Sequence, residues 1–131
     1  MTKILPKTNN MSQQQPSPQF VQTVAASVAF WQERTKDLDD ETIVRLDRDR
    51  ENLYRVVQFG LGLAETWRET AVVALQCFPF IEQHGYWPEW TPFLEKSLQL
   101  CNEQDSRLRF KILARLGQFY RLNHRLPLAI T

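Results

Sequence analysis

The chain contains few residues that could perform chemistry, and their spacing argues against a reactive site. Its only histidines are His84 and His124, and its two cysteines are Cys77 and Cys101. A zinc ion needs three or four suitably spaced ligands, whereas Cys77 and His84 lie on one expected helix with Pro79 between them. The cysteines fall within apolar helical patterns, so we expect two reduced, buried thiols. No metal site and no cofactor are expected.

The carboxylates and glycines do not form a catalytic pattern either. Asp47, Asp49 and Glu51 alternate with arginines, which is typical of a solvated ion-pair surface. The Gly60–Gly62 segment is too short for a phosphate-binding loop, and we expect it to end a helix. No serine occupies a recognisable nucleophile turn. The sequence therefore predicts a protein that is not an enzyme.

The strongest chemical signal is the charge of the last segment. From Ser106 to Thr131 the chain has six basic residues and no acidic one, whereas the preceding part has ten basic and fifteen acidic residues. Arg107, Lys111 and Arg115 are spaced four apart, so they share one face of a helix. Three interpretations of this face stay open: a solvated or internally paired face, a protein-binding surface, and a salt-sensitive contact with nucleic acid.

The composition predicts one globular, all-α domain. With 131 residues and 43% apolar residues the chain can bury a core, and its four glycines and lack of alternating apolar patterns argue against a sheet. Residues 1–16 are polar and glutamine-rich, so we expect a disordered tail there and a helical domain over residues 17–131. No apolar run could cross a bilayer and no secretory signal is evident, which favours the cytoplasm.

About five helices joined by short loops are expected, and short loops place neighbouring helices antiparallel. Pro79 removes one hydrogen bond from the third helix and should kink or shorten it. The expected fold is a right-handed stack of antiparallel helical hairpins. The helices are expected from Ser17-Pro18 to about Lys36, from Asp39 or Asp40 to Gly60, from a Thr66–Glu69 capping box to Gly85, from Trp87-Pro88 to Cys101, and from Asp105 past Tyr120, with a sixth starting at Pro127.

The last expected helix resembles the start of a tetratricopeptide (TPR) unit. The matching segment is Leu113-Ala-Arg-Leu116-Gly117-Gln-Phe-Tyr120, followed by Ala129. By this resemblance, Gly117 lets two helices approach closely, Tyr120 fills the gap between them, and Ala129 is the first small residue of a second helix. We expect this last unit to be incomplete, because its later positions lie beyond Thr131.

Earlier segments show two further resemblances. Gly85 with Trp87 is similar to the turn of a degenerate TPR unit, although Trp90 stands where a small alanine is usual. The segments 46–53, 80–87 and 94–98 are similar to the region before the repeats in STAND-type signalling ATPases and related bacterial regulators. The phosphate loop of that family, G-x-x-x-x-G-K-[ST], is missing, so only its helical scaffold part is implied.

These resemblances imply a non-catalytic scaffold for protein–protein interactions, in a signalling or transcriptional setting. The candidate partner-binding residues are Trp87, Trp90, Arg107, Lys111 and Arg115. Leu116 belongs to the repeat signature. Two alternatives are kept. One is a small nucleic-acid-associated regulator that uses the basic C-terminal helix, and the other is a homo-oligomerisation module that pairs through the incomplete last repeat.

Overall fold

The computed structural model describes the backbone of residues 15–130 and the side chains of residues 15–122. This part of the chain contains α-helices and one 3-10 turn, with no strand, which confirms the all-α class. Seven α-helices are present rather than about five. They are α2 (Pro18–Arg34), α3 (Asp40–Arg48), α4 (Arg50–Leu61), α5 (Trp67–Gln76), α6 (Phe78–His84), α7 (Trp87–Leu100) and α8 (Ser106–Ile130), with η2 (Glu103–Asp105) before α8.

Two expected helices are each divided in two by a single residue. Asp49 leaves the helical conformation between α3 and α4, with φ −98° and ψ 16°. Cys77 separates α5 from α6, and Pro79 then lies in the first turn of α6. Because the proline ring would clash with a carbonyl one turn earlier, the helix ends before it, and a proline is accommodated where a new helix begins. Of the two expected effects of Pro79, a kink or a shortened helix, the structure shows the shortened helix.

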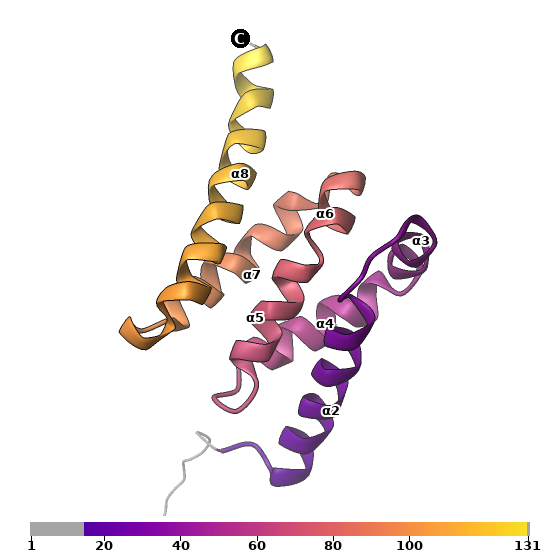
Figure 1. Ribbon diagram of the computed structural model, residues 1–131, viewed down its shortest axis with the longest axis vertical. Helices are drawn as coiled ribbons and strands as arrows, with labels where there is room; N and C mark the ends of the chain where they lie inside the picture. Colours follow the sequence, from indigo (N-terminus) through magenta and orange to yellow (C-terminus); the bar gives the residue numbers. More distant parts are fainter. Residues whose placement is uncertain (1–14, 131) are drawn as a thin grey trace, which may run out of the picture.

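The C-terminal helix is longer than expected. Helix α8 runs without a break from Ser106 to Ile130, so the prediction of a separate helix starting at Pro127 is wrong. Ala129, which was expected in that second helix, lies in α8, and its side chain is outside the described residues. In Figure 1 the last turns of α8 project beyond the other helices.

Two of the expected helix starts have the predicted caps. The Ser17 hydroxyl accepts a hydrogen bond from the Phe20 amide at 3.1 Å, and the Asp39 carboxylate accepts one from the Thr42 amide at 2.8 Å. Each cap satisfies one of the first amides of a helix, which have no partner within the helix itself. The starts of α2 and α3 are thus fixed by local sequence.

The expected capping box at Thr66 is replaced by a contact with α4. The Thr66 hydroxyl donates to the Gly60 carbonyl at 2.7 Å, and the Thr70 hydroxyl donates to the Thr66 carbonyl at the same distance. A Cβ atom built on Gly60 would lie 2.1 Å from Thr70 Oγ1 and 3.0 Å from Val28 Cγ2. Only glycine fits here, and it lets α2, α4 and α5 meet at one point.

Helix α5 lies at the centre of the molecule, between α2 and the α7–α8 pair (Figure 1). It packs against α2, α4 and α7, while α8 packs mainly on α7. None of the described helices combines the length and the apolar character needed to cross a bilayer. The largest fully buried side chains include Trp90, Phe80, Phe119, Leu46, Leu53 and Ile81.

A polar cluster joins the α3–α4 break to the α6–α7 junction. The Tyr86 hydroxyl donates to Asp47 Oδ1 at 2.6 Å, and Arg50 donates to the same oxygen at 2.7 Å. His84 Nε2 lies 3.9 Å from that oxygen. The Tyr86 hydrogen bond, and then that of Arg50, lower the pKa of Asp47 below its usual value. The ionised carboxylate therefore helps to hold the two junctions together.

Replacing Tyr86 with phenylalanine is expected to weaken the acid sensitivity of the fold. Because the pKa of Asp47 is lower in the folded state, this group stabilises the protein above about pH 4 and loses that contribution as the pH falls through the folded pKa. Tyr86→Phe removes the hydrogen bond that is the main cause of the lowered Asp47 pKa. The melting temperature of this variant should therefore fall less between pH 5 and pH 3 than that of the wild type. Thermal melts followed by circular dichroism measure this difference.

The Asp47→Asn variant tests whether the pH effect of the Tyr86 substitution acts through Asp47. In Asp47→Asn protein the same Tyr86 substitution should leave the pH dependence unchanged, because the carboxylate that it influences is gone. Asp39 and Asp105 also have lowered pKa values, so some acid sensitivity should remain in every variant. If the melting temperatures of wild type and Tyr86→Phe changed with pH in parallel, the Tyr86 hydroxyl would not be the group that lowers the pKa of Asp47.

Candidate functional site

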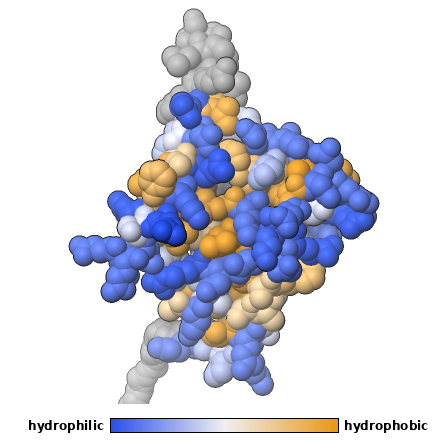
Figure 2. Space-filling model, in the orientation of Figure 1, coloured by the Kyte–Doolittle hydropathy of each residue, from blue (hydrophilic) through white to orange (hydrophobic). Residues whose placement is uncertain are grey.

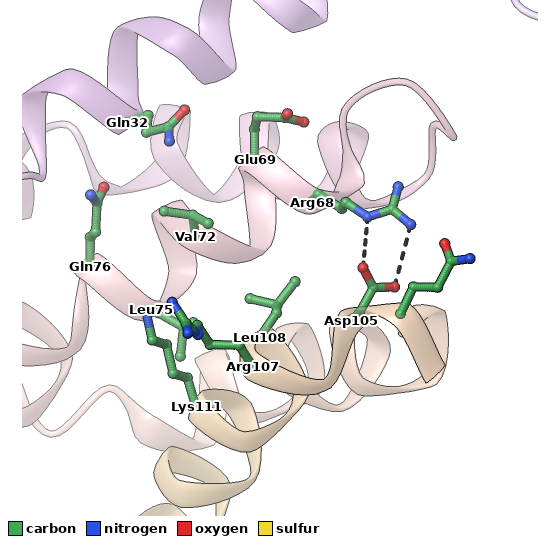
Figure 3. Close-up of a pocket in the computed structure, with 11 residues that line it drawn as sticks. Gln32, Arg68, Glu69, Val72, Leu75, Gln76, Asp105, Arg107, Leu108 and Lys111 are labelled. Atoms are coloured by element: carbon green, nitrogen blue, oxygen red, sulfur yellow. Dashed lines mark hydrogen bonds and ion pairs between the residues drawn. The ribbon is translucent and has the colours of Figure 1, made fainter. Parts of the chain in front are cut away.

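An open groove of about 620 Å³ lies between α2, α5, η2 and the start of α8. Figure 3 shows side chains from all of these elements directed around it. Its volume falls within the range of roughly 300–1,000 Å³ that is usual for ligand sites. The groove is lined by Gln32, Arg68, Glu69, Val72, Leu75, Gln76, Gln104, Asp105, Arg107, Leu108 and Lys111.

The floor of the groove is apolar. Val72 and Leu75 come from α5, and Leu108 comes from the first turn of α8. All three side chains are half-buried. Valine and leucine at positions three apart lie on one helical face, which here turns toward α8. The floor therefore offers apolar surface that a partner could still cover.

Two cationic side chains border this floor. Arg107 and Lys111 are exposed, and both extend toward the Leu75 end of the groove (Figure 3). Among the described residues neither forms an ion pair. Their charges are therefore available for an acidic group on a bound molecule.

An ion pair closes the opposite end of the groove. Arg68 donates two hydrogen bonds to Asp105, from Nε to Oδ1 at 2.9 Å and from Nη2 to Oδ2 at 3.3 Å (Figure 3). Asp105 also accepts from the Asn102 amide at 3.1 Å. The Arg68 hydrogen bond is the main cause that lowers the pKa of Asp105. The charge of Arg68 is thus used within the protein and fixes η2 against α5.

Amide side chains form the edge of the groove next to α2. Gln32 and Gln76 face each other there in Figure 3. The Gln76 carbonyl oxygen accepts a hydrogen bond from the buried Thr35 hydroxyl at 2.9 Å, which holds this amide in place. Glutamine amides both donate and accept hydrogen bonds, as backbone peptide groups do. This edge is suited to contacts with the backbone of a bound peptide.

Of the two tryptophans expected to anchor a partner, Trp90 is not available for that role. Trp90 is 0% exposed and contacts the rings of Tyr54 and Phe93, each with a centroid distance of 5.4 Å. Trp87 is half-buried and lies against Gly85. The expectation that Trp90 reaches the surface is wrong, because Pro88 lies in the first turn of α7 and does not turn the chain outward.

The third residue of the expected basic face has a different environment. The Arg115 guanidinium lies 3.9 Å from the centroid of the Phe78 ring and donates to Gln118 Oε1 at 3.0 Å. A guanidinium over an aromatic ring is stabilised by the ring electrons and covers apolar surface. Arg115 therefore acts as a cover for the α6 end of the core and does not line the groove.

The residues of the expected repeat signature have mixed environments. Leu116 is buried, and Gly85 has φ +72°, the left-handed conformation that favours glycine at a helix end. Gly117 does not mediate a close approach, because a Cβ there would meet no described atom within 4 Å. Tyr120 is exposed and donates to Glu95 Oε2 at 2.6 Å, so it does not fill a gap between helices.

No protein-family model, curated protein or solved structure matches this chain. Among the described side chains, no group of three or more histidine, cysteine, aspartate or glutamate residues is arranged to hold a metal ion. The face shown in Figure 2 is mostly hydrophilic, with apolar side chains in separate patches. The chemistry of the groove is therefore the most direct guide to function.

Proposed function

We propose that this protein is a non-catalytic, cytoplasmic scaffold of TPR type that binds a peptide segment of a partner protein in the groove between α2, α5 and α8. The observation that carries the proposal is the combination of a half-buried apolar floor with the exposed cations Arg107 and Lys111. The groove is formed by three helices and a fixed 3-10 turn. A preformed surface lowers the ordering cost of binding.

The packing of the helices supports a stack of antiparallel hairpins, which we propose to be right-handed. Helices α4 and α5, α5 and α7, and α7 and α8 pack in succession. In Figure 1 helix α7 runs back along α5, and α8 reverses direction again. Gly85 provides the tight turn between α6 and α7. A TPR-like array would have such an order, and one side of its stack would present a continuous binding surface.

The groove favours a peptide that carries both apolar and acidic side chains. An aliphatic side chain would cover Val72, Leu75 and Leu108, and a carboxylate would pair with Arg107 or Lys111. Nucleic acid fits less well. Its phosphates would approach Glu69 and Asp105, which also line the groove, and Arg115 is already stacked on Phe78. The lining thus supports a protein partner over the nucleic-acid alternative.

Selection of peptides from a random display library on the purified protein tests this proposal. Selected peptides should bind with dissociation constants of about 1–100 µM and should carry an aliphatic residue near an aspartate or glutamate. Lys111→Glu should weaken binding at least about tenfold, since it reverses one of the two open cations. Lys96→Glu on α7 makes the same charge change at an exposed position outside the groove and should change binding less than about twofold.

Two outcomes would overturn the peptide-binding function. The first is a set of selected peptides that bind wild type, Lys111→Glu and Leu108→Ser equally. The second is binding of an unrelated DNA or RNA duplex whose affinity falls steeply with salt, which is the signature of phosphate contacts. Peptide binding in a mainly apolar groove should fall only a few-fold between about 50 and 200 mM salt.

A further inference from the structure

The outward side of α8 carries a second, separate apolar feature. Phe110, Leu113 and Tyr120 are 73%, 45% and 41% exposed, respectively, and Gly117 lies between the last two. These four residues, called the α8 seam below, follow one another at steps of three, four and three. Such steps place them in one narrow line along a helix, as in the contact line of a coiled coil.

The core does not need the α8 seam. A different side of the same helix buries Ile112, Leu116 and Phe119 in the packing against the rest of the protein. A helix with one buried apolar face normally carries polar residues on the other. Instead, the most exposed large apolar side chain among the described residues, Phe110, stands on the outward face. The seam is thus surface that the described part of the chain leaves uncovered.

The charged side chains that α8 itself places around the seam all have one sign. Within its described part α8 carries five basic residues and no acidic one. At 100° per residue, Arg121 flanks one side of the seam and Arg109 flanks the other. One carboxylate of another helix, that of Glu95 on α7, accepts the Tyr120 hydrogen bond and so lies at the Tyr120 end of the seam. A molecule that covers the seam therefore meets apolar side chains bordered by cations.

We propose that the α8 seam docks an amphipathic α-helix of a partner protein whose apolar residues are flanked by glutamate or aspartate. The apolar spacing matches a second helix, and the flanking cations match acidic positions on it. Gly117 adds room, because a Cβ there would meet no described atom within 4 Å, so another backbone can approach closely. The seam and the peptide groove are distinct surfaces, and neither proposal depends on the other.

Two other occupants agree less well with these features. If a second copy paired through the same seam, two α8 helices would lie against each other. The charged side chains described in α8 are all basic, and like charges repel. An anionic membrane matches the charge, but helices that lie on membranes bury a broad apolar face, whereas this seam is one residue wide. The features therefore favour a helix of opposite charge.

The test uses two designed, fluorescein-labelled helical peptides of three heptads. Both carry leucine at the a and d positions, and one has glutamate and the other lysine at the e and g positions. Fluorescence anisotropy should show that the glutamate peptide binds with a dissociation constant of about 10 µM or tighter and that the lysine peptide binds at least about tenfold more weakly. Equal binding of both peptides would overturn the proposed charge match.

Variants on the surface locate the binding. Gly117→Gln adds an extended side chain at a position where its Cβ would meet no described atom within 4 Å, so the fold should be kept while glutamate-peptide binding falls at least about tenfold. Phe110→Ser, at a highly exposed position, should have the same effect. Val44→Gln changes an exposed apolar residue on α3 and should leave binding within about twofold. Unchanged binding by Gly117→Gln and Phe110→Ser would refute the seam.

Further measurements separate this proposal from the alternatives. Leu75→Ser alters the groove and should leave glutamate-peptide binding intact, so the two proposed sites can fail independently. Light scattering that shows a dimer in wild type and a monomer in Gly117→Gln would assign the seam to a second copy. Cosedimentation with phosphatidylserine–phosphatidylcholine vesicles, lost in Phe110→Ser, would assign it to a membrane. Either result would overturn the proposal.

Discussion

Replacing Trp90 with alanine is expected to destabilise the protein by about 3–5 kcal/mol, which is enough to unfold many domains of this size. The side chain is fully buried, and its ring contacts those of Tyr54, Phe93 and Phe80 between α4, α6 and α7. Removing it leaves a large cavity that neighbouring aromatic rings cannot fill. Urea unfolding followed by far-ultraviolet circular dichroism measures the change without relying on tryptophan fluorescence.

Trp87 provides the matched comparison for this substitution. It is half-buried at the start of α7, so Trp87→Ala removes less buried area and should cost clearly less than Trp90→Ala. If Trp90 were a surface anchor for a partner, its replacement would reduce binding and leave the unfolding curve unchanged. That result would contradict the buried position described above.

Replacing Gly60 with alanine is expected to destabilise the protein by about 2–3 kcal/mol, although alanine normally favours a helix. The added methyl group would lie 2.1 Å from the Thr70 hydroxyl oxygen and 3.0 Å from Val28. Thr70 cannot move away easily, because its hydroxyl is buried and bonded to the Thr66 carbonyl. The helices must therefore separate, and chemical denaturation should report a lower unfolding midpoint.

Two further variants identify the contact that is responsible. Adding Thr70→Ala to Gly60→Ala should recover part of the lost stability, since it removes the closest atom. Gly117→Ala, a chemically identical change at an open helical position, should instead stabilise the protein by about 0.5–1 kcal/mol. Equal effects of the two glycine substitutions, or no recovery in the double variant, would show that Gly60 does not act through Thr70.

The sequence predicted those parts of the fold that depend on local chemistry. Ser17 and Asp39 cap helices, Gly85 ends one, and Pro79 prevents one helix from continuing, because each effect arises within a few residues. The break at Asp49 could not be predicted in this way. Apolar residues continue at helical spacing through it, and the Asp47 carboxylate beside it accepts a tertiary hydrogen bond from Tyr86 as well as a local one from Arg50.

The candidate site was predictable only in its charged part. Arg107 and Lys111 stand out in the sequence because they repeat at four residues in a segment without acids. Val72 and Leu75 gave no such signal, since apolar residues at helical spacing look the same whether they are buried or line a groove. Trp90 was expected to reach the surface for a related reason: the neighbouring prolines indicate the start of a helix, and sequence does not show which face the helix buries.

The order in which the helices pack has a consequence for how fast the chain folds. Helices α4, α5, α7 and α8 contact near neighbours along the sequence, and α2 reaches only as far as α5. Few long loops must therefore close before apolar surface is buried, and the entropic part of the folding barrier is small. Helical proteins with such local contacts fold in microseconds to milliseconds, and their transition states form from adjacent helices.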